Sequence, residues 1–169
     1  MNSPLVLMDS PRINRSAKRM AYEILERNTD NSDIFLFGID ERGYAVAQKL
    51  VEVLSDIAEV EIDSAQLPLK KGDPYTVINE LDSAEMQKNL VLIVDDVIFS
   101  GQTMFQALTT VVNGLELSEV HTAVMIDRGH RKFPVQAEFC GMELPTKVNE
   151  HVSVVVNGMD VLKVVLEKV

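Results

Sequence analysis

The stretch from residue 89 to residue 103, NLVLIVDDVIFSGQT, constrains the fold of this chain more than any other segment. Residues 90–94 are an unbroken apolar run rich in β-branched side chains, which is typical of a strand buried on both faces of a parallel sheet. Two aspartates and a turn of small residues follow, and the apolar side chains of residues 104–112 then recur at helical spacing. The pattern predicts a strand, an acidic pair, a turn and a helix in direct succession.

This succession suits a phosphorylated sugar. In an open α/β sheet, ligands bind beyond the carboxyl ends of the strands, and a helix start offers unpaired N–H groups to an anion. Ser100, Gly101 and Thr103 are small enough for the backbone to surround a phosphate, and the two hydroxyls can donate to it. Asp95 and Asp96 are poor phosphate ligands but good acceptors for vicinal hydroxyls, so the stretch predicts a site for a ribose 5-phosphate. The alternative is a buried strand that ends in an Asp-rich turn with a helix cap.

Residues 94–103 resemble the phosphoribosyl-pyrophosphate motif of type I phosphoribosyltransferases, in which two acids and two apolar residues precede a small-Gly-x-Thr loop. The resemblance implies an α/β fold with a mainly parallel, twisted sheet, flanking helices and a small hood. It also implies that the motif contacts the substrate through Asp95, Asp96, Val97, Phe99, Ser100, Gly101, Gln102 and Thr103.

The bulk composition fits one globular domain over residues 1–169. The apolar fraction is 46%, the charged fraction is 25%, and the net charge of −10 argues against a surface that generally coats nucleic acid. No apolar run approaches a membrane span, and the first four residues do not resemble a signal peptide. We expect a cytoplasmic protein without a membrane anchor, in which the single Cys140 is an inert, buried thiol.

Strands alternating with helices predict a mainly parallel sheet with helices on both faces. The first helix is expected to begin at Ser10 as N-cap, with Pro11 in its first turn. The other expected elements are helices at 44–55 and 160–169, strands at 34–37, 60–63, 77–78, 120–126 and 152–156, an outer, antiparallel strand over 135–139, and a loop at 64–74.

The segment GIDERG, residues 38–43, follows one of these strands. Arg42 can hold a diphosphate with its planar guanidinium, although a plain strand–helix turn explains the pattern equally well. The resemblance assigns this segment to the pyrophosphate loop, which makes Gly38, Asp40, Glu41, Arg42 and Gly43 candidate substrate contacts. The two acids depart from the basic or small polar residues usual there. They would repel a diphosphate unless Mg²⁺ lies between them or they point away.

A second resemblance is narrower. The segments DRGHR at 127–131, LPT at 144–146 and AYEILERN at 21–28 resemble the bifunctional pyrimidine-operon attenuator and uracil phosphoribosyltransferase (PyrR) family. The resemblance spans roughly residues 10–156. It implies a reaction of uracil with phosphoribosyl pyrophosphate to give UMP and pyrophosphate, Mg²⁺ with Asp95 and Asp96 as candidate ligands, and a homodimer or larger assembly. The base pocket would be bordered by Asp127, Arg128, His130 and Arg131, for which the alternative is a solvated basic loop.

The loop at 64–74 departs most from that family, whose corresponding segment is longer and carries a Tyr-Arg-Asp-Asp element. Lys70, Lys71 and Tyr75 are the nearest replacements here. A shorter lid excludes water less well, so activity is expected to be low or the substrate to be another base. The competing hypothesis is a nucleotide-sensing RNA-binding regulator with weak or no catalysis. Its basic patch would combine Arg15, Lys18 and Arg19 with Arg128, His130 and Arg131.

Overall fold

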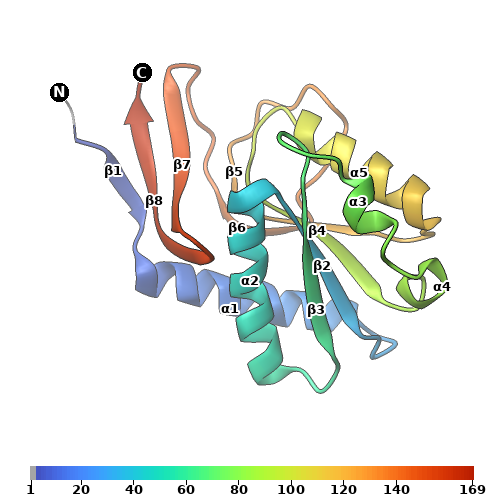
Figure 1. The fold of residues 1–169 in the computed structure, drawn as a ribbon. Coiled ribbons are helices and arrows are strands. Elements are labelled where there is room, and N and C mark those ends of the chain that lie inside the picture. The colour runs from blue at the N-terminus through green and yellow to red at the C-terminus, as the bar shows by residue number, and fades with distance from the viewer. Residues whose placement is uncertain (1–2) are drawn as a thin grey trace.

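A five-stranded parallel sheet lies at the centre of the protein in the computed structural model, which describes residues 3–169 (Figure 1). Residues 1–2, part of the segment expected not to be a signal peptide, lie outside the described residues. The strand order is β3-β2-β4-β5-β6. The strands are β2 (Ile34–Ile39), β3 (Ile62–Leu67), β4 (Leu90–Ile98), β5 (His121–Asp127) and β6 (Phe139–Glu143).

Helices cover both faces of this sheet, as the alternation of elements predicts. Alternate side chains of β4 point to opposite faces, because successive residues of a strand do so. Leu92 and Val94 pack with α1 (Ser10–Arg27) and α2 (Asp40–Ile57), whereas Val91 and Ile93 pack with α5 (Gln102–Leu115). The second face also receives the short helices α3 (Tyr75–Ile78) and α4 (Ser83–Met86). Each face therefore has its own apolar core.

A small antiparallel sheet, which is the expected hood, lies to one side of the main sheet in Figure 1. It has the order β1-β8-β7 and consists of β1 (Leu5–Met8), β7 (Glu150–Asn157) and β8 (Asp160–Lys168). The helix expected at 160–169 is therefore wrong. Valines at 161, 164 and 165 favour a strand, and Gly158, with φ 61°, begins the two-residue turn that pairs Asn157 with Asp160.

Several boundaries differ from those expected. Asp9, not Ser10, caps α1, and its side chain accepts a hydrogen bond of 3.0 Å from the Arg12 N–H. α2 begins at Asp40 directly after β2 rather than at residue 44, and β3 occupies 62–67 rather than 60–63. Residues 75–78 are helical rather than extended.

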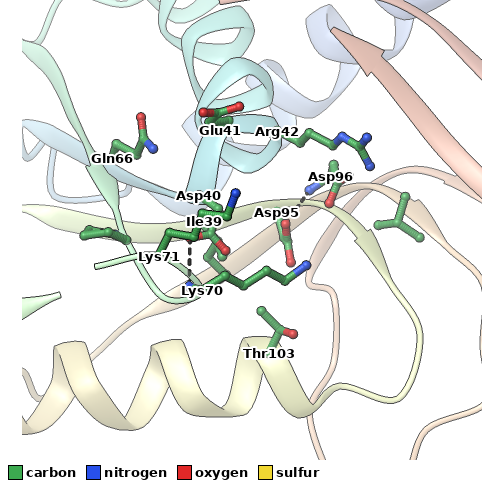
Figure 2. A pocket seen from close by; sticks show the side chains of 12 residues that line it. Ile39, Asp40, Glu41, Arg42, Gln66, Lys70, Lys71, Asp95, Asp96 and Thr103 are labelled. Atoms are coloured by element: carbon green, nitrogen blue, oxygen red, sulfur yellow. Dashed lines mark hydrogen bonds between the residues drawn. The ribbon is translucent and has the colours of Figure 1, made fainter. Parts of the chain in front are cut away.

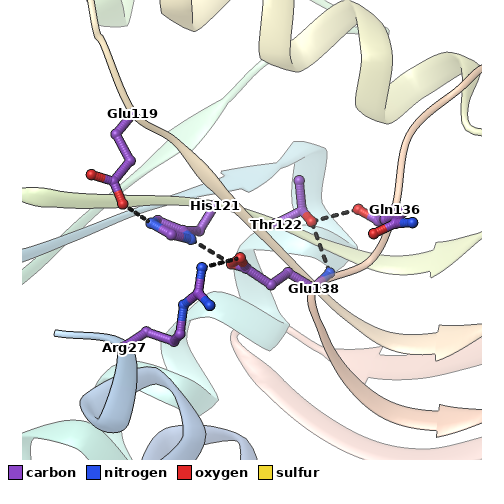
Figure 3. A network of polar contacts seen from close by, with 6 residues as sticks. All are labelled: Arg27, Glu119, His121, Thr122, Gln136 and Glu138. Atoms are coloured by element: carbon purple, nitrogen blue, oxygen red, sulfur yellow. Dashed lines mark hydrogen bonds and ion pairs between the residues drawn. The ribbon is translucent and has the colours of Figure 1, made fainter.

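The last strand of the main sheet, β6, runs parallel to β5, so the antiparallel strand expected over 135–139 is wrong. The network in Figure 3 fixes the start of β6 beside β5. The Glu138 N–H donates to Thr122 Oγ1 (3.0 Å), and that hydroxyl donates to the Gln136 carbonyl (2.6 Å). The Glu138 carboxylate contacts His121 and, at 3.2 Å, Arg27 of α1. These bonds hold the returning chain at the amino end of β5, which imposes the parallel direction.

Within residues 3–169, no helix combines the length and the apolar content needed to cross a lipid bilayer.

Candidate functional site

A cavity of about 500 Å³ opens at the carboxyl ends of β2, β3 and β4 (Figure 2). This is the edge where an open α/β sheet binds ligands. The cavity brings together most of the acidic and basic residues predicted from the sequence. Its lining residues are Ile39, Asp40, Glu41, Arg42, Gln66, Pro68, Lys70, Lys71, Asp95, Asp96, Val97 and Thr103.

The acidic pair lies within β4 rather than beyond its end. Strand pairing continues through both residues, since Asp95 lies opposite Val124 of β5 and Val97 opposite Ile126. Asp95 is only 9% exposed, and its Oδ1 accepts a hydrogen bond of 2.8 Å from the Asp96 N–H. Burial raises the pKa of the Asp95 carboxyl well above its usual range, and the adjacent Asp96 charge adds to this effect. The two carboxyls therefore differ in exposure, because Asp95 is buried and Asp96 is half-buried.

The raised pKa of Asp95 predicts a pH dependence of stability. The folded protein favours the protonated carboxyl more than the unfolded chain does. The contribution of Asp95 to the free energy of unfolding is therefore fully present below the ordinary Asp pKa of roughly 4, and it is lost as the pH rises through the raised pKa of the folded state. Asp95→Asn should therefore flatten the decline in unfolding free energy above roughly pH 4, as measured by urea unfolding across pH. Asp56→Asn, an exposed position near the end of α2, is the control. An unchanged decline in Asp95→Asn would contradict the prediction.

The turn after β4 leads directly into α5. Gly101 has φ 85°, and a Cβ there would come within 2.6 Å of Val135 Cγ2, so this position requires glycine. No side chain accepts a hydrogen bond at the N-cap of α5, although Ser100 Oγ accepts one from the Gln102 N–H (3.2 Å). Thr103 lines the cavity, while Phe99, Ser100, Gly101 and Gln102 are not among its lining residues. The first turn of α5 can thus hold an anion at the edge of the cavity.

The glycines of the 38–43 segment serve packing. A Cβ on Gly38 would lie 2.3 Å from Tyr44 Cα, and one on Gly43 would lie 2.8 Å from the Val94 carbonyl oxygen. Their absence of side chains lets α2 start directly against β4. The three residues between Ile39 and Gly43 line the cavity, and Arg42 extends beside Asp96 in Figure 2.

The second side of the cavity is formed by β3 and the loop after it. Because residues 64–67 belong to β3, the loop expected at 64–74 is reduced to 68–74. Gln66 and Pro68 line the cavity together with Lys70 and Lys71, and neither Gln66 nor Pro68 was predicted. Had the strand been assigned to 62–67, the parallel order would have placed Gln66 at the same edge as Asp95.

The segment 127–131 lies behind the turn rather than in the cavity lining. Arg128 is buried, and its guanidinium carbon lies 4.4 Å from the centre of the Phe99 ring. The guanidinium also donates to Thr146 Oγ1 (2.9 Å). Arg131 pairs with Asp127 (2.8 Å) and donates to the Phe99 carbonyl (3.0 Å), and His130 Nε2 contacts the Thr146 carbonyl. Since Arg128 is buried, it cannot join Arg15 and Lys18 in the exposed basic patch that we expected.

Cys140 is half-buried rather than buried, but it fits the inert role expected for it. Burial raises the pKa of its thiol to about 11, so the reactive thiolate is scarce at neutral pH. Arg19 of α1 donates to the carbonyls of Cys140 and Gly141 at 2.9 and 2.7 Å, which covers the outer edge of β6.

The carboxylates of the cavity do not form a complete metal site by themselves. Within residues 3–169, no group of three or more His, Cys, Asp or Glu side chains is arranged to hold an ion. Mg²⁺ characteristically takes one or two protein carboxylates and completes its shell with substrate phosphates and water. Asp96 fits that role better than Asp95, whose raised pKa favours the protonated form.

The parallel sheet, the hood, and a cavity lined by an acidic pair beside the start of α5 define a type I phosphoribosyltransferase fold. The phosphoribosyl transferase domain family matches residues 6–157. The hypoxanthine phosphoribosyltransferase of Trypanosoma cruzi has this fold, with a TM-score of 0.76 at 16% identity over 97% of this chain and 96% of that chain.

Two curated relatives indicate a narrower group within this family. The Bifunctional protein PyrR of Herpetosiphon aurantiacus is 33% identical over 165 residues, 94% of this chain and 93% of that protein. The protein of the same name from Ligilactobacillus salivarius is 34% identical over 164 residues, 91% of this chain and 92% of that protein. The chain therefore belongs to the phosphoribosyltransferase family, in the group of bifunctional PyrR proteins. It is an enzyme of the pentosyltransferase class.

Proposed function

We propose that this protein transfers ribose 5-phosphate from phosphoribosyl pyrophosphate to uracil, giving UMP and pyrophosphate. The observation that carries the proposal is the order of groups around one cavity. Asp95 and Asp96 offer acceptors for a diol, with the start of α5 on one side and Arg42, Lys70 and Lys71 as cations for a diphosphate. The choice of uracil rests on the resemblance to the attenuator and uracil phosphoribosyltransferase family and on the PyrR relatives.

In this proposal the residues act by position and charge. Asp95 and Asp96 bind the ribose hydroxyls, the turn from Ser100 to Thr103 binds the 5-phosphate, and Arg42 binds the diphosphate with Lys70 and Lys71. As the bond between C1 and the diphosphate oxygen breaks, the ribose gains oxocarbenium character. A base nitrogen then bonds to C1 and loses its proton to water or to the departing pyrophosphate. The negative charge of Asp96 stabilises that cationic ribose, and the three cations stabilise the departing pyrophosphate. Mg²⁺, when bound, would neutralise part of the diphosphate charge, with Asp96 as its protein ligand.

The test is a pyrophosphate-release assay with phosphoribosyl pyrophosphate, Mg²⁺ and a panel of uracil, hypoxanthine and guanine. We expect release that depends on uracil, with a reaction lacking any base as the blank. Purines belong in the panel because solved structures with this fold include a hypoxanthine enzyme. Release with hypoxanthine or guanine but not with uracil would overturn the choice of base while keeping the transferase.

A second candidate is a nucleotide-sensing regulator that binds RNA. It is favoured by the name "bifunctional" of the relatives and by the exposed Arg15 and Lys18 on α1. Filter binding to pyrimidine-leader RNA across a salt series tests it, because contacts between lysine or arginine and phosphate give a salt-dependent affinity. Affinity equal to that for an unrelated RNA would count against this role. The resemblance also supports a cytoplasmic location and a homodimer or larger assembly. Sedimentation analysis of the purified protein would reveal the assembly.

A further inference from the structure

Asp40 has an unusual backbone conformation at the edge of the cavity. Its φ is 51°, in the left-handed region that few non-glycine residues adopt, although aspartate and asparagine tolerate it better than most. The residue follows β2 directly, at the first position of α2. A strained conformation that persists at a site is a reason to examine what the side chain does there.

The Asp40 side chain reaches across to the 68–74 loop. Its Oδ1 accepts hydrogen bonds from two successive backbone N–H groups, Leu69 at 2.8 Å and Lys70 at 3.2 Å. Figure 2 shows the bond to the Lys70 backbone, with the Lys70 side chain directed toward Asp95 and Thr103. Lys70 and its neighbour Lys71 both line the cavity. The carboxylate is therefore occupied by the loop backbone instead of being directed at an incoming anion.

We infer that Asp40 is a positioning residue that fixes the 68–74 loop over the cavity, so that Lys70 and Lys71 meet the diphosphate. The assignment to the diphosphate rests on the proposed function, whereas the effect of Asp40 on the loop does not. An acidic residue at this position then helps anion binding indirectly. Its charge is used by two N–H groups, and hydrogen bonds to a charged acceptor are stronger than those between neutral groups. In this proposal, a short loop held in place by Asp40 does the work of the longer, closing lid of the family that the sequence resembles.

Three substitutions separate the parts of this inference. Asp40→Asn keeps an Oδ1 acceptor and tolerates a positive φ. Asp40→Gly relieves the backbone strain but removes the acceptor. Asp40→Ala removes the acceptor and also disfavours the positive φ. Asp82→Ala is the matched control, since Asp82 also accepts from two backbone N–H groups, those of Ala84 and Glu85, and is not a cavity residue.

The first measurement is hydrogen exchange of the ligand-free protein. The Leu69 and Lys70 amides should exchange at least roughly tenfold faster in Asp40→Gly than in the wild type, while Asp40→Asn keeps most of the protection. Asp82→Ala should leave these two amides unchanged. If both amides exchange equally fast in the wild type and in Asp40→Gly, the inference is overturned whatever the protein catalyses.

The second measurement is a double-mutant cycle on the KM for phosphoribosyl pyrophosphate. Asp40→Gly should raise KM roughly tenfold with a smaller change in kcat, and Asp40→Asn should restore most of it. In a Lys70→Ala, Lys71→Ala background, the same Asp40→Gly change should have little further effect, because its action passes through those lysines. Full additivity would overturn the positioning role. A wild type that does not bind phosphoribosyl pyrophosphate would refute the proposed function and leave the exchange result to decide the effect on the loop.

Discussion

The double variant Asp95→Asn, Asp96→Asn is expected to lose roughly a thousandfold or more in kcat/KM, with the fold intact. Asparagine keeps the size of the side chain but removes the negative charge that we assign to stabilising the cationic ribose. The amide oxygen introduced at position 95 can still accept a hydrogen bond from the backbone N–H of residue 96, so the local structure should persist. The measurement is the rate of pyrophosphate release under subsaturating phosphoribosyl pyrophosphate.

A charge-matched control makes this result specific. Asp56→Asn with Asp63→Asn removes two carboxylates from exposed positions that do not line the cavity, and should keep wild-type kinetics. Of the two single changes, Asp96→Asn should cost more than Asp95→Asn, because burial already favours a protonated Asp95. Wild-type turnover in the double variant would remove Asp95 and Asp96 from the catalytic assignment.

Gly38→Ala should destabilise the fold by roughly 3 kcal/mol and also abolish activity. The added Cβ would lie 2.3 Å from Tyr44 Cα and 2.8 Å from the Gly43 carbonyl oxygen, and neither backbone atom can rotate away. The start of α2 would have to move off the sheet and carry Asp40 and Arg42 out of place. Urea unfolding measures the stability, and pyrophosphate release measures the activity.

Gly158→Ala is the comparison for this prediction. Gly158 has φ 61° with open space around its Cα, so an alanine there costs only backbone strain, about 1–2 kcal/mol. This hairpin turn lies away from the cavity, and its variant should keep the wild-type KM. Equal stabilities of the two variants would mean that the contact between α2 and β2 is looser than the structure indicates.

The sheet was predictable because its strands carry strong apolar patterns. The run at 90–94 and the apolar segments at 34–37 and 120–126 correspond to β4, β2 and β5. The helix predicted for the C-terminal segment was wrong because the apolar residues of this segment fit a helical face as well as a strand. The two-residue turn at Gly158 decides between them only when the pairing with β7 is known. The direction of β6 depends on tertiary bonds from Thr122, which no local pattern reveals.

The candidate site was predictable where one continuous segment supplies it. The acidic pair and Thr103 reach the same cavity, as the motif at 94–103 indicated. Gln66 and Pro68 were missed because their place depends on the register between β3 and β2. The role of Asp40 was also beyond the sequence. The sequence predicted that the acid would repel a diphosphate unless Mg²⁺ intervened or the side chain pointed away, but not that it would bond to a loop 29 residues further along the chain.

The bonds that join the turn after β4 to the segment after β5 have a consequence for how fast a ligand can associate. The carbonyls of Ile98, Phe99 and Ser100 each accept a hydrogen bond from residues 128–132, at 2.8 to 3.0 Å. Ordering a free loop costs about 1–2 kcal/mol per residue, and here folding has already met that cost. If this turn binds the 5-phosphate as we propose, a sugar phosphate encounters a preformed site, and its association should be limited by diffusion and charge rather than by rearrangement of the chain.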